Sequence, residues 1–75
     1  MLDNLPLLLI VDDDHIFRQV LAKAMLKRGY EVIQAESVEQ AIELIALQTP
    51  EYAVIDLKMN GASGLELVKY LHDLD

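Results

Sequence analysis

The feature that most constrains the fold is an apolar run, Leu7 to Val11, that ends directly in Asp12, Asp13 and Asp14. The run does not alternate apolar with polar residues, and it is far too short to cross a membrane. It is typical of a strand that is buried on both faces of a parallel sheet. Because ligands bind beyond the carboxyl ends of such strands, the aspartates stand where a binding site is expected.

A second apolar segment, residues 52–55, ends in the same way, in Asp56. If the two strands are parallel neighbours, Asp56 faces Asp12 and Asp13 across one crevice. Crowded carboxylates repel one another unless a cation joins them, and oxygen ligands at this density suit Mg²⁺. Two of the carboxylates can hold the ion while the third attacks phosphorus, since aspartates form acyl-phosphates.

The elements between and after these strand ends alternate, which gives a βαβαβα order. Helices are expected at residues 15–28, from a capping box at 37–40 to about 48, and from a second capping box at 63–66 onward. Strands are expected at 7–11, 30–35 and 52–55. The apolar stripe of the first helix consists of Phe17, Val20, Leu21, Ala24 and Met25, and that of the third helix of Leu65, Val68 and Leu71.

This alternation predicts an α/β fold with a parallel sheet and right-handed crossovers. In a strand order of 2-1-3, the first helix covers one face of the sheet, and the second and third helices cover the other. The strand at residues 52–55 is then an open edge. An open edge offers unpaired backbone groups to another chain, so self-association through this strand is expected.

Composition excludes several classes of protein. The chain has 75 residues, enough for one domain at most, and no cysteine for a disulfide or thiolate metal site. Its net charge of −7 excludes nucleic-acid binding by this segment, because phosphate contacts need clustered Lys and Arg. The chain starts without a basic stretch typical of a secretion signal and has no membrane-length apolar run, so the cytoplasm is the expected compartment.

Three phrases carry a resemblance to a known family: Leu-Leu-Ile-Val-Asp-Asp-Asp, Tyr-Ala-Val-Ile-Asp-Leu-Lys-Met and Ser-Gly-Leu-Glu-Leu-Val. Together they resemble the receiver domain of two-component response regulators, over about residues 7–74. Phrases such as Arg-Gly-Tyr-Glu-Val are similar, more narrowly, to redox-responsive regulators of the PrrA/RegA type. The resemblance implies a flavodoxin-like (CheY-like) doubly wound fold and a signalling role rather than an enzymatic one.

The resemblance also implies a role for each site residue. Asp56 matches the phosphoacceptor. Asp13 matches the direct Mg²⁺ ligand, Asp12 the acidic residue that holds the metal through water, and Lys58 the residue whose backbone carbonyl completes the site. The phosphoryl donor would be a phosphohistidine on a sensor histidine kinase, and the full-length parent would regulate transcription.

Receivers have five strands, whereas residues 1–75 match only the first three strands and helices of one. The resemblance therefore implies a partial receiver domain. The Ser or Thr of strand four and the Lys of strand five, which contact the phosphoryl group, have no counterpart in these residues. An isolated chain with one poorly covered sheet face is expected to self-associate or to lack a fixed structure.

Two other functions are compatible with parts of the sequence. Asp12-x-Asp14 after an apolar strand also resembles the first motif of haloacid-dehalogenase-type phosphatases, in which Asp12 would be the nucleophile and Asp14 the general acid. That interpretation leaves Asp56 unexplained. The second alternative is a structural fragment without a signalling role, in which the aspartates only cap a helix and end a strand.

Overall fold

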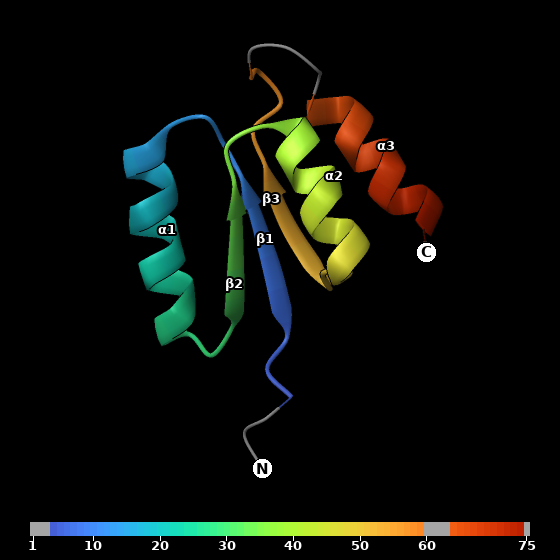
Figure 1. Cartoon of the computed structure of the whole chain (residues 1–75). Helices are drawn as coiled ribbons and strands as arrows, with labels where there is room; N and C mark the ends of the chain where they lie inside the picture. Colours follow the sequence, from blue (N-terminus) through green and yellow to red (C-terminus); the bar gives the residue numbers. More distant parts are fainter. Residues whose placement is uncertain (1–3, 60–63, 75) are drawn as a thin grey trace.

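Three parallel strands form the centre of the structure, with β1 between β2 and β3 (Figure 1). The computed structural model describes residues 4–59 and 64–74. The elements are β1 (Leu7–Val11), α1 (His15–Lys27), β2 (Glu31–Ala35), α2 (Val38–Leu47), β3 (Tyr52–Ile55) and α3 (Gly64–Leu74). The α/β class, the element order and the 2-1-3 strand order predicted from the sequence are confirmed.

Local side-chain hydrogen bonds fix the helix ends. The Asp14 carboxylate accepts the N–H of Phe17 at 3.0 Å and caps α1. The Ser37 hydroxyl accepts the N–H of Gln40 at 3.0 Å and caps α2. After the C-cap of α1, Gly29 has a φ of 94°, a conformation that L-residues with a side chain rarely adopt. Ser63, which belongs to the second predicted capping box, lies outside the described residues.

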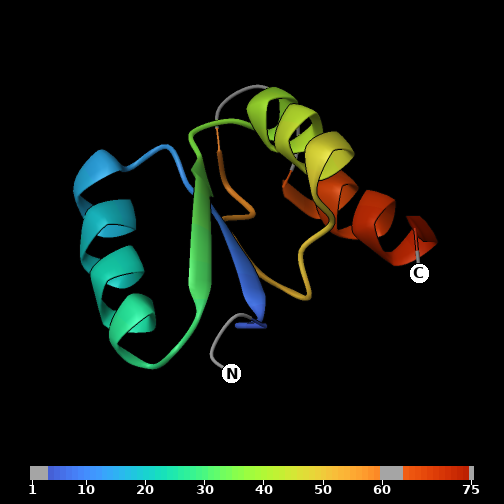
Figure 2. The same ribbon diagram turned by 60° about the horizontal axis from the view of Figure 1, so that its bottom comes forward.

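The two faces of the sheet are covered by different helices, as Figure 2 shows: α1 lies on one side, and α2 and α3 lie on the other. β1 contributes to both faces because successive side chains of a strand alternate. Leu8 and Ile10 pack with Ala22 of α1. The larger cluster, on the other face, contains Leu9, Val11, Ala35, Val38, Ala41, Ile45, Met59 and Leu67.

The predicted stripe of α1 is wrong in part. Phe17 is 46% exposed, Val20 is 64% exposed, and Ala24 is also exposed. The helix instead buries Ala22, while Leu21 and Met25 pack beside it. The small Ala22 side chain lets the helix approach the sheet closely, so the contact is centred on Ala22 and turns Val20 toward solvent.

The predicted stripe of α3 is also wrong in part. Leu67 is fully buried, and Tyr70 and Leu71 pack against the same cluster. Leu65 and Val68, predicted to lie on the packed side, are 63% and 41% exposed. The helix carries two overlapping apolar stripes, and tertiary packing against α2 and the sheet selects the one that contains Leu67.

β3 is an edge strand within the described part of the chain. It pairs with β1 in the register Leu8↔Tyr52 to Val11↔Ile55, and no described segment pairs with its outer side. Tyr52 is 54% exposed and Val54 is 39% exposed. The Tyr52 ring contacts that of Tyr30 edge-on, with centroids 5.7 Å apart. Among the described residues, the open edge predicted for this strand is therefore present.

Candidate metal centre

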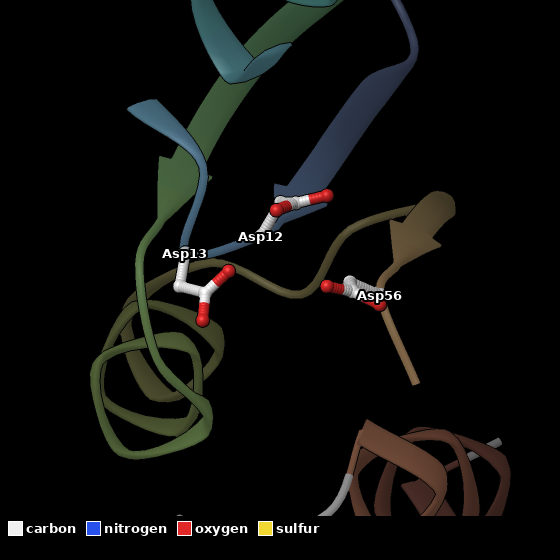
Figure 3. A group of neighbouring side chains, drawn as sticks. All are labelled: Asp12, Asp13 and Asp56. Carbon is white, nitrogen blue, oxygen red and sulfur yellow. The ribbon is translucent and has the colours of Figure 1, made fainter. Parts of the chain in front are cut away.

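The carboxyl ends of β1 and β3 bring three carboxylates together. Asp12, Asp13 and Asp56 each offer an oxygen atom within 4.8 Å of the other two (Figure 3). The strand register produces this convergence, because Val11 lies beside Ile55 and the N–H of Asp56 bonds to the carbonyl of Val11 at 2.9 Å. The predicted proximity of these side chains is thus present, while the roles assigned to them stay predictions.

The loop after β1 holds Asp12 through its backbone and its side chain. Its N–H donates to the carbonyl of Ala35, the last residue of β2, at 3.1 Å. Its Oδ1 atom accepts the N–H of Asp14 at 2.8 Å, in a tight turn that leads into α1. The Asp14 side chain is the N-cap of α1, and it is not among the three converging carboxylates.

The loop after β3 orients Asp56 in a similar way. The backbone N–H of Lys58 donates to Oδ1 of Asp56 at 2.9 Å. Gly64, the first residue of α3, lies against the backbone of Asp56. A Cβ atom at Gly64 would overlap the carbonyl oxygen of Asp56 and would lie 3.0 Å from its carbonyl carbon. The close approach of α3 to this strand end therefore requires glycine.

The electrostatics of the cluster favour a bound cation. Asp12 and Asp56 are half-buried, and none of the three carboxylates forms an ion pair within residues 4–59 and 64–74. Two unit charges about 4 Å apart repel by about 1 kcal/mol in water and by more near a protein surface. Mg²⁺ prefers oxygen ligands and usually keeps several waters, so carboxylate oxygens of three residues within 4.8 Å of one another can hold one such ion, directly or through water.

Sequence reasoning missed two residues that shape this site. The guanidinium of Arg18, on α1, donates to the carbonyl of Asp12 at 2.7 Å. Its position four residues after the N-cap Asp14 was a usable signal, because a long side chain there can reach back to the loop. For Gly64, the signal was a glycine at a helix start, a place where it needs a packing reason.

The fold and the acidic cluster together define a class of protein. The model of the family described as "Response regulator receiver domain" matches residues 8–75. The chain therefore belongs to the receiver domains of two-component response regulators. Receiver domains are signalling domains rather than classical enzymes. The match includes both acidic strand ends, Asp56 among them, and does not favour the phosphatase alternative in which Asp12 is the nucleophile.

Particular relatives narrow the comparison. The chain is 43% identical over 68 residues to the photosynthetic apparatus regulatory protein RegA of Rhodovulum sulfidophilum; the aligned part is 91% of this chain and 37% of RegA. A similar comparison gives 47% identity over 62 residues to the acid tolerance regulatory protein ActR of Rhizobium meliloti, covering 83% and 32% of the two chains. The chain thus spans about a third of the length of these relatives. Similarity to regulators of the RegA type was predicted and is confirmed.

A solved structure with the same fold carries a phosphorylated aspartic acid. The match is a response regulator from Burkholderia pseudomallei with a phosphorylated aspartic acid, a calcium ion and citrate. It has a TM-score of 0.86 at 34% identity and covers 93% of this chain and 41% of that one. The CheY-like fold predicted from the sequence is confirmed.

In the part of the chain that the structure describes, no helix is long and apolar enough to span a membrane.

Proposed function

We propose that Asp56 accepts a phosphoryl group from the phosphohistidine of a sensor histidine kinase, with Mg²⁺ bound beside it. The observation that carries this proposal is the convergence of the carboxylates of Asp12, Asp13 and Asp56 from two strand ends. Asp13 would be the direct metal ligand, and Asp12 would hold the ion through water. Asp56 and the backbone carbonyl of Lys58 would complete the site.

The reaction requires only a few groups of this chain. A carboxylate oxygen of Asp56 forms a bond to phosphorus while the phosphorus–nitrogen bond of the donor breaks, and the electron pair stays on the imidazole nitrogen. The Lys58 amide orients the Asp56 carboxylate for this attack. A bound Mg²⁺ would neutralise part of the negative charge on the phosphoryl oxygens. The phosphorylated aspartic acid and calcium ion of the Burkholderia pseudomallei regulator support this assignment.

The identity of the modified residue is tested with a small phosphodonor and Mg²⁺, followed by borohydride trapping and mass spectrometry. We expect the label on Asp56 and its loss in Asp56→Asn. The Glu43→Gln variant is the control, because it removes one charge from an exposed position of α2. Label on Asp12 would instead support phosphatase-type chemistry, and no label with bound Mg²⁺ would overturn the proposal.

The metal site is tested by titration of the chain with Mg²⁺, followed by NMR or calorimetry. Binding relieves the repulsion among the carboxylates, so we expect weak but saturable binding at neutral pH. Asp13→Asn removes a direct ligand and should weaken the affinity at least about tenfold, as loss of metal-site residues commonly does. Glu43→Gln should leave it within about twofold. Equal affinities of Asp13→Asn and the parent would exclude the site as described.

The wider role follows from the relatives. We propose that residues 1–75 form part of a larger receiver domain and serve a cytoplasmic regulator of transcription. The support is the similarity to RegA and to the phosphate regulon transcriptional regulatory protein PhoB of Pseudomonas aeruginosa, which is 38% identical over 64 residues. The acidic charge of this segment assigns DNA contact to another part of such a protein.

We also propose that the 75-residue chain pairs with a second copy through the outer edge of β3. No described segment pairs with the outer backbone groups of this edge, and the side chains of Tyr52 and Val54 are exposed; both observations support this proposal. Sedimentation over a range of micromolar concentrations should show association. Val54→Lys should abolish it, and Val20→Lys on α1 should not. A monomer at every concentration would overturn the proposal.

A further inference from the structure

Arg18 is the one described cation whose side chain bonds to the loop that carries Asp12 and Asp13. It lies in the first turns of α1 and is half-buried. Its Nη1 atom donates to the carbonyl oxygen of Asp12 at 2.7 Å, a short bond that the positive charge strengthens. Its Nη2 atom lies 3.3 Å from Nδ1 of His15. The side chain therefore joins the start of α1 to the end of β1.

The contact with the Asp12 carbonyl has a geometric consequence for Asp13. That carbonyl belongs to the planar peptide that links the two residues, so fixing its direction fixes where the Asp13 Cα atom lies. The other backbone group of Asp12 is held by the carbonyl of Ala35. β2 therefore holds one side of Asp12, and Arg18 holds the peptide on the other side.

The burial of the Arg18 side chain supports a specific contact with the Asp12 carbonyl. The Nε atom of Arg18 is buried and has no hydrogen-bond partner within the described residues. Leaving a donor buried and unpaired costs free energy. An arginine whose only task was to cover the helix surface would turn that atom to water. The observed conformation keeps the guanidinium on the Asp12 carbonyl in spite of this cost.

We propose that Arg18 is a positioning residue of the cation site, which holds the Asp12–Asp13 peptide so that both carboxylates point at the ion. This inference rests on the proposed Mg²⁺ site. Two effects of Arg18 on Mg²⁺ affinity have opposite signs. Its charge opposes a nearby divalent cation, whereas its hydrogen bond keeps the ligands in place. The sign of the change on its removal therefore separates positioning from simple electrostatics.

The test is Mg²⁺ titration of the full chain and of Arg18→Met, Arg18→Lys and Arg28→Met. If Arg18 positions the ligands, Arg18→Met should weaken binding about tenfold, the lower end of the range for residues that orient metal ligands. Arg18→Lys, which keeps one donor, should fall between. Arg28→Met removes the same charge from the other end of α1 and should leave affinity unchanged or slightly raised. Unchanged or tighter binding by Arg18→Met would overturn the proposal.

A second readout does not depend on the metal. Without Mg²⁺, the amide signal of Asp13, which belongs to the same peptide as the Asp12 carbonyl, should shift in the NMR spectrum of Arg18→Met, but not in that of Arg28→Met. If the parent and Asp13→Asn both fail to bind Mg²⁺, the proposed metal site fails, and this amide readout still decides the role of Arg18. Identical Asp13 amide behaviour in all variants would exclude positioning. If Arg18→Met unfolds, Arg18→Lys is compared with Arg28→Lys by the same two measurements.

Discussion

The two faces of the sheet are packed very differently, although both include residues of β1. On the α2 and α3 face, Leu9 and Val11 lie in a cluster to which both helices and Met59 contribute. On the α1 face, Leu8 and Ile10 share a cluster with one buried helix residue, the small Ala22. One helix covers what two cover on the other side (Figure 2). Most of the cohesion of this chain therefore comes from the α2 and α3 face.

The acidic site draws one half from each face. Asp56 is supported by the α2 and α3 face, because Gly64 lets the start of α3 lie against the backbone of Asp56. Asp12 and Asp13 depend on the thinner face, where the first turns of α1 supply the Arg18 contact. α1 therefore contributes less to the core than to the geometry of the loop after β1. Substitutions on the two faces should accordingly affect stability and the site to different extents.

The largest expected effect is on the packed face. Leu9→Ala should destabilise the chain by about 3–5 kcal/mol, because Leu9 is fully buried in the larger cluster. A domain of this size has only ~3–5 kcal/mol of stability, so this variant should be largely unfolded. Leu8→Ala, the matched change one residue away, should cost about 2–3 kcal/mol, since the thinner α1 face can collapse into the space.

Circular dichroism without denaturant measures the folded fraction of Leu9→Ala, and urea denaturation at the same protein concentration measures the stability of Leu8→Ala and the parent. The difference between them tests the comparison of the faces directly. Equal losses, or a larger loss for Leu8→Ala, would show that α1 covers its face as effectively as α2 and α3 cover theirs.

A smaller effect is expected from substitutions at Gly64 and Gly29. Gly64→Ala forces a Cβ atom into the Asp56 backbone, which cannot move as a flexible side chain can, and should cost about 1–3 kcal/mol. Gly29→Ala meets no atom within 4 Å, and its cost of about 1–2 kcal/mol comes from the backbone conformation alone. The two losses overlap in size, so a second measurement is needed to separate them.

That measurement is the NMR shift of the Lys58 amide, which donates to the Asp56 carboxylate. Gly64→Ala should move this signal and weaken Mg²⁺ binding, because it displaces Asp56. Gly29→Ala should change neither. An unmoved Lys58 amide in Gly64→Ala would mean that the start of α3 shifts while the strand end stays in place.

The strands and the meeting of the acidic ends could be predicted because they depend on short, local patterns. A continuous apolar run that ends in Asp12 predicts a buried parallel strand and the position of its carboxyl end. Right-handed crossovers then fix the sides of the helices. The helix caps at Asp14 and Ser37 were equally accessible, because each depends on one side chain and an amide three residues away.

The packed sides of α1 and α3 could not be predicted in the same way. Periodicity identifies apolar stripes, but α1 has more apolar residues than its contact with three strands can cover, so Phe17 and Val20 stay exposed. Packing distance decides the centre of contact, and the small Ala22 sets it. Arg18 contacts the backbone of Asp12, and Gly64 lies against the backbone of Asp56. Both contacts are with loops outside the helix, so the helical periodicity of the sequence does not predict them.

The smallest expected effect concerns the exposed side of α1. Val20→Ala should leave the free energy of unfolding unchanged or raise it by a few tenths of a kcal/mol, because Ala is the better helix former. A buried valine would lose most of its ~1.5–3 kcal/mol of burial instead. Leu21→Ala, the neighbouring control, should destabilise by about 1–2 kcal/mol, because Leu21 packs against the smaller cluster.

Both variants are measured by thermal and urea denaturation at low and high protein concentration. The exposed fraction of Val20, 64%, leaves little contact to lose in the single chain. A loss above about 1 kcal/mol at every concentration would mean that α1 packs through the stripe read from its sequence. A loss that appears only at high concentration would place Val20 in the contact between two copies, beyond the β3 edge. A neutral result for Val20 beside a loss for Leu21 would leave α1 held by one narrow side, with its other apolar side chains in water.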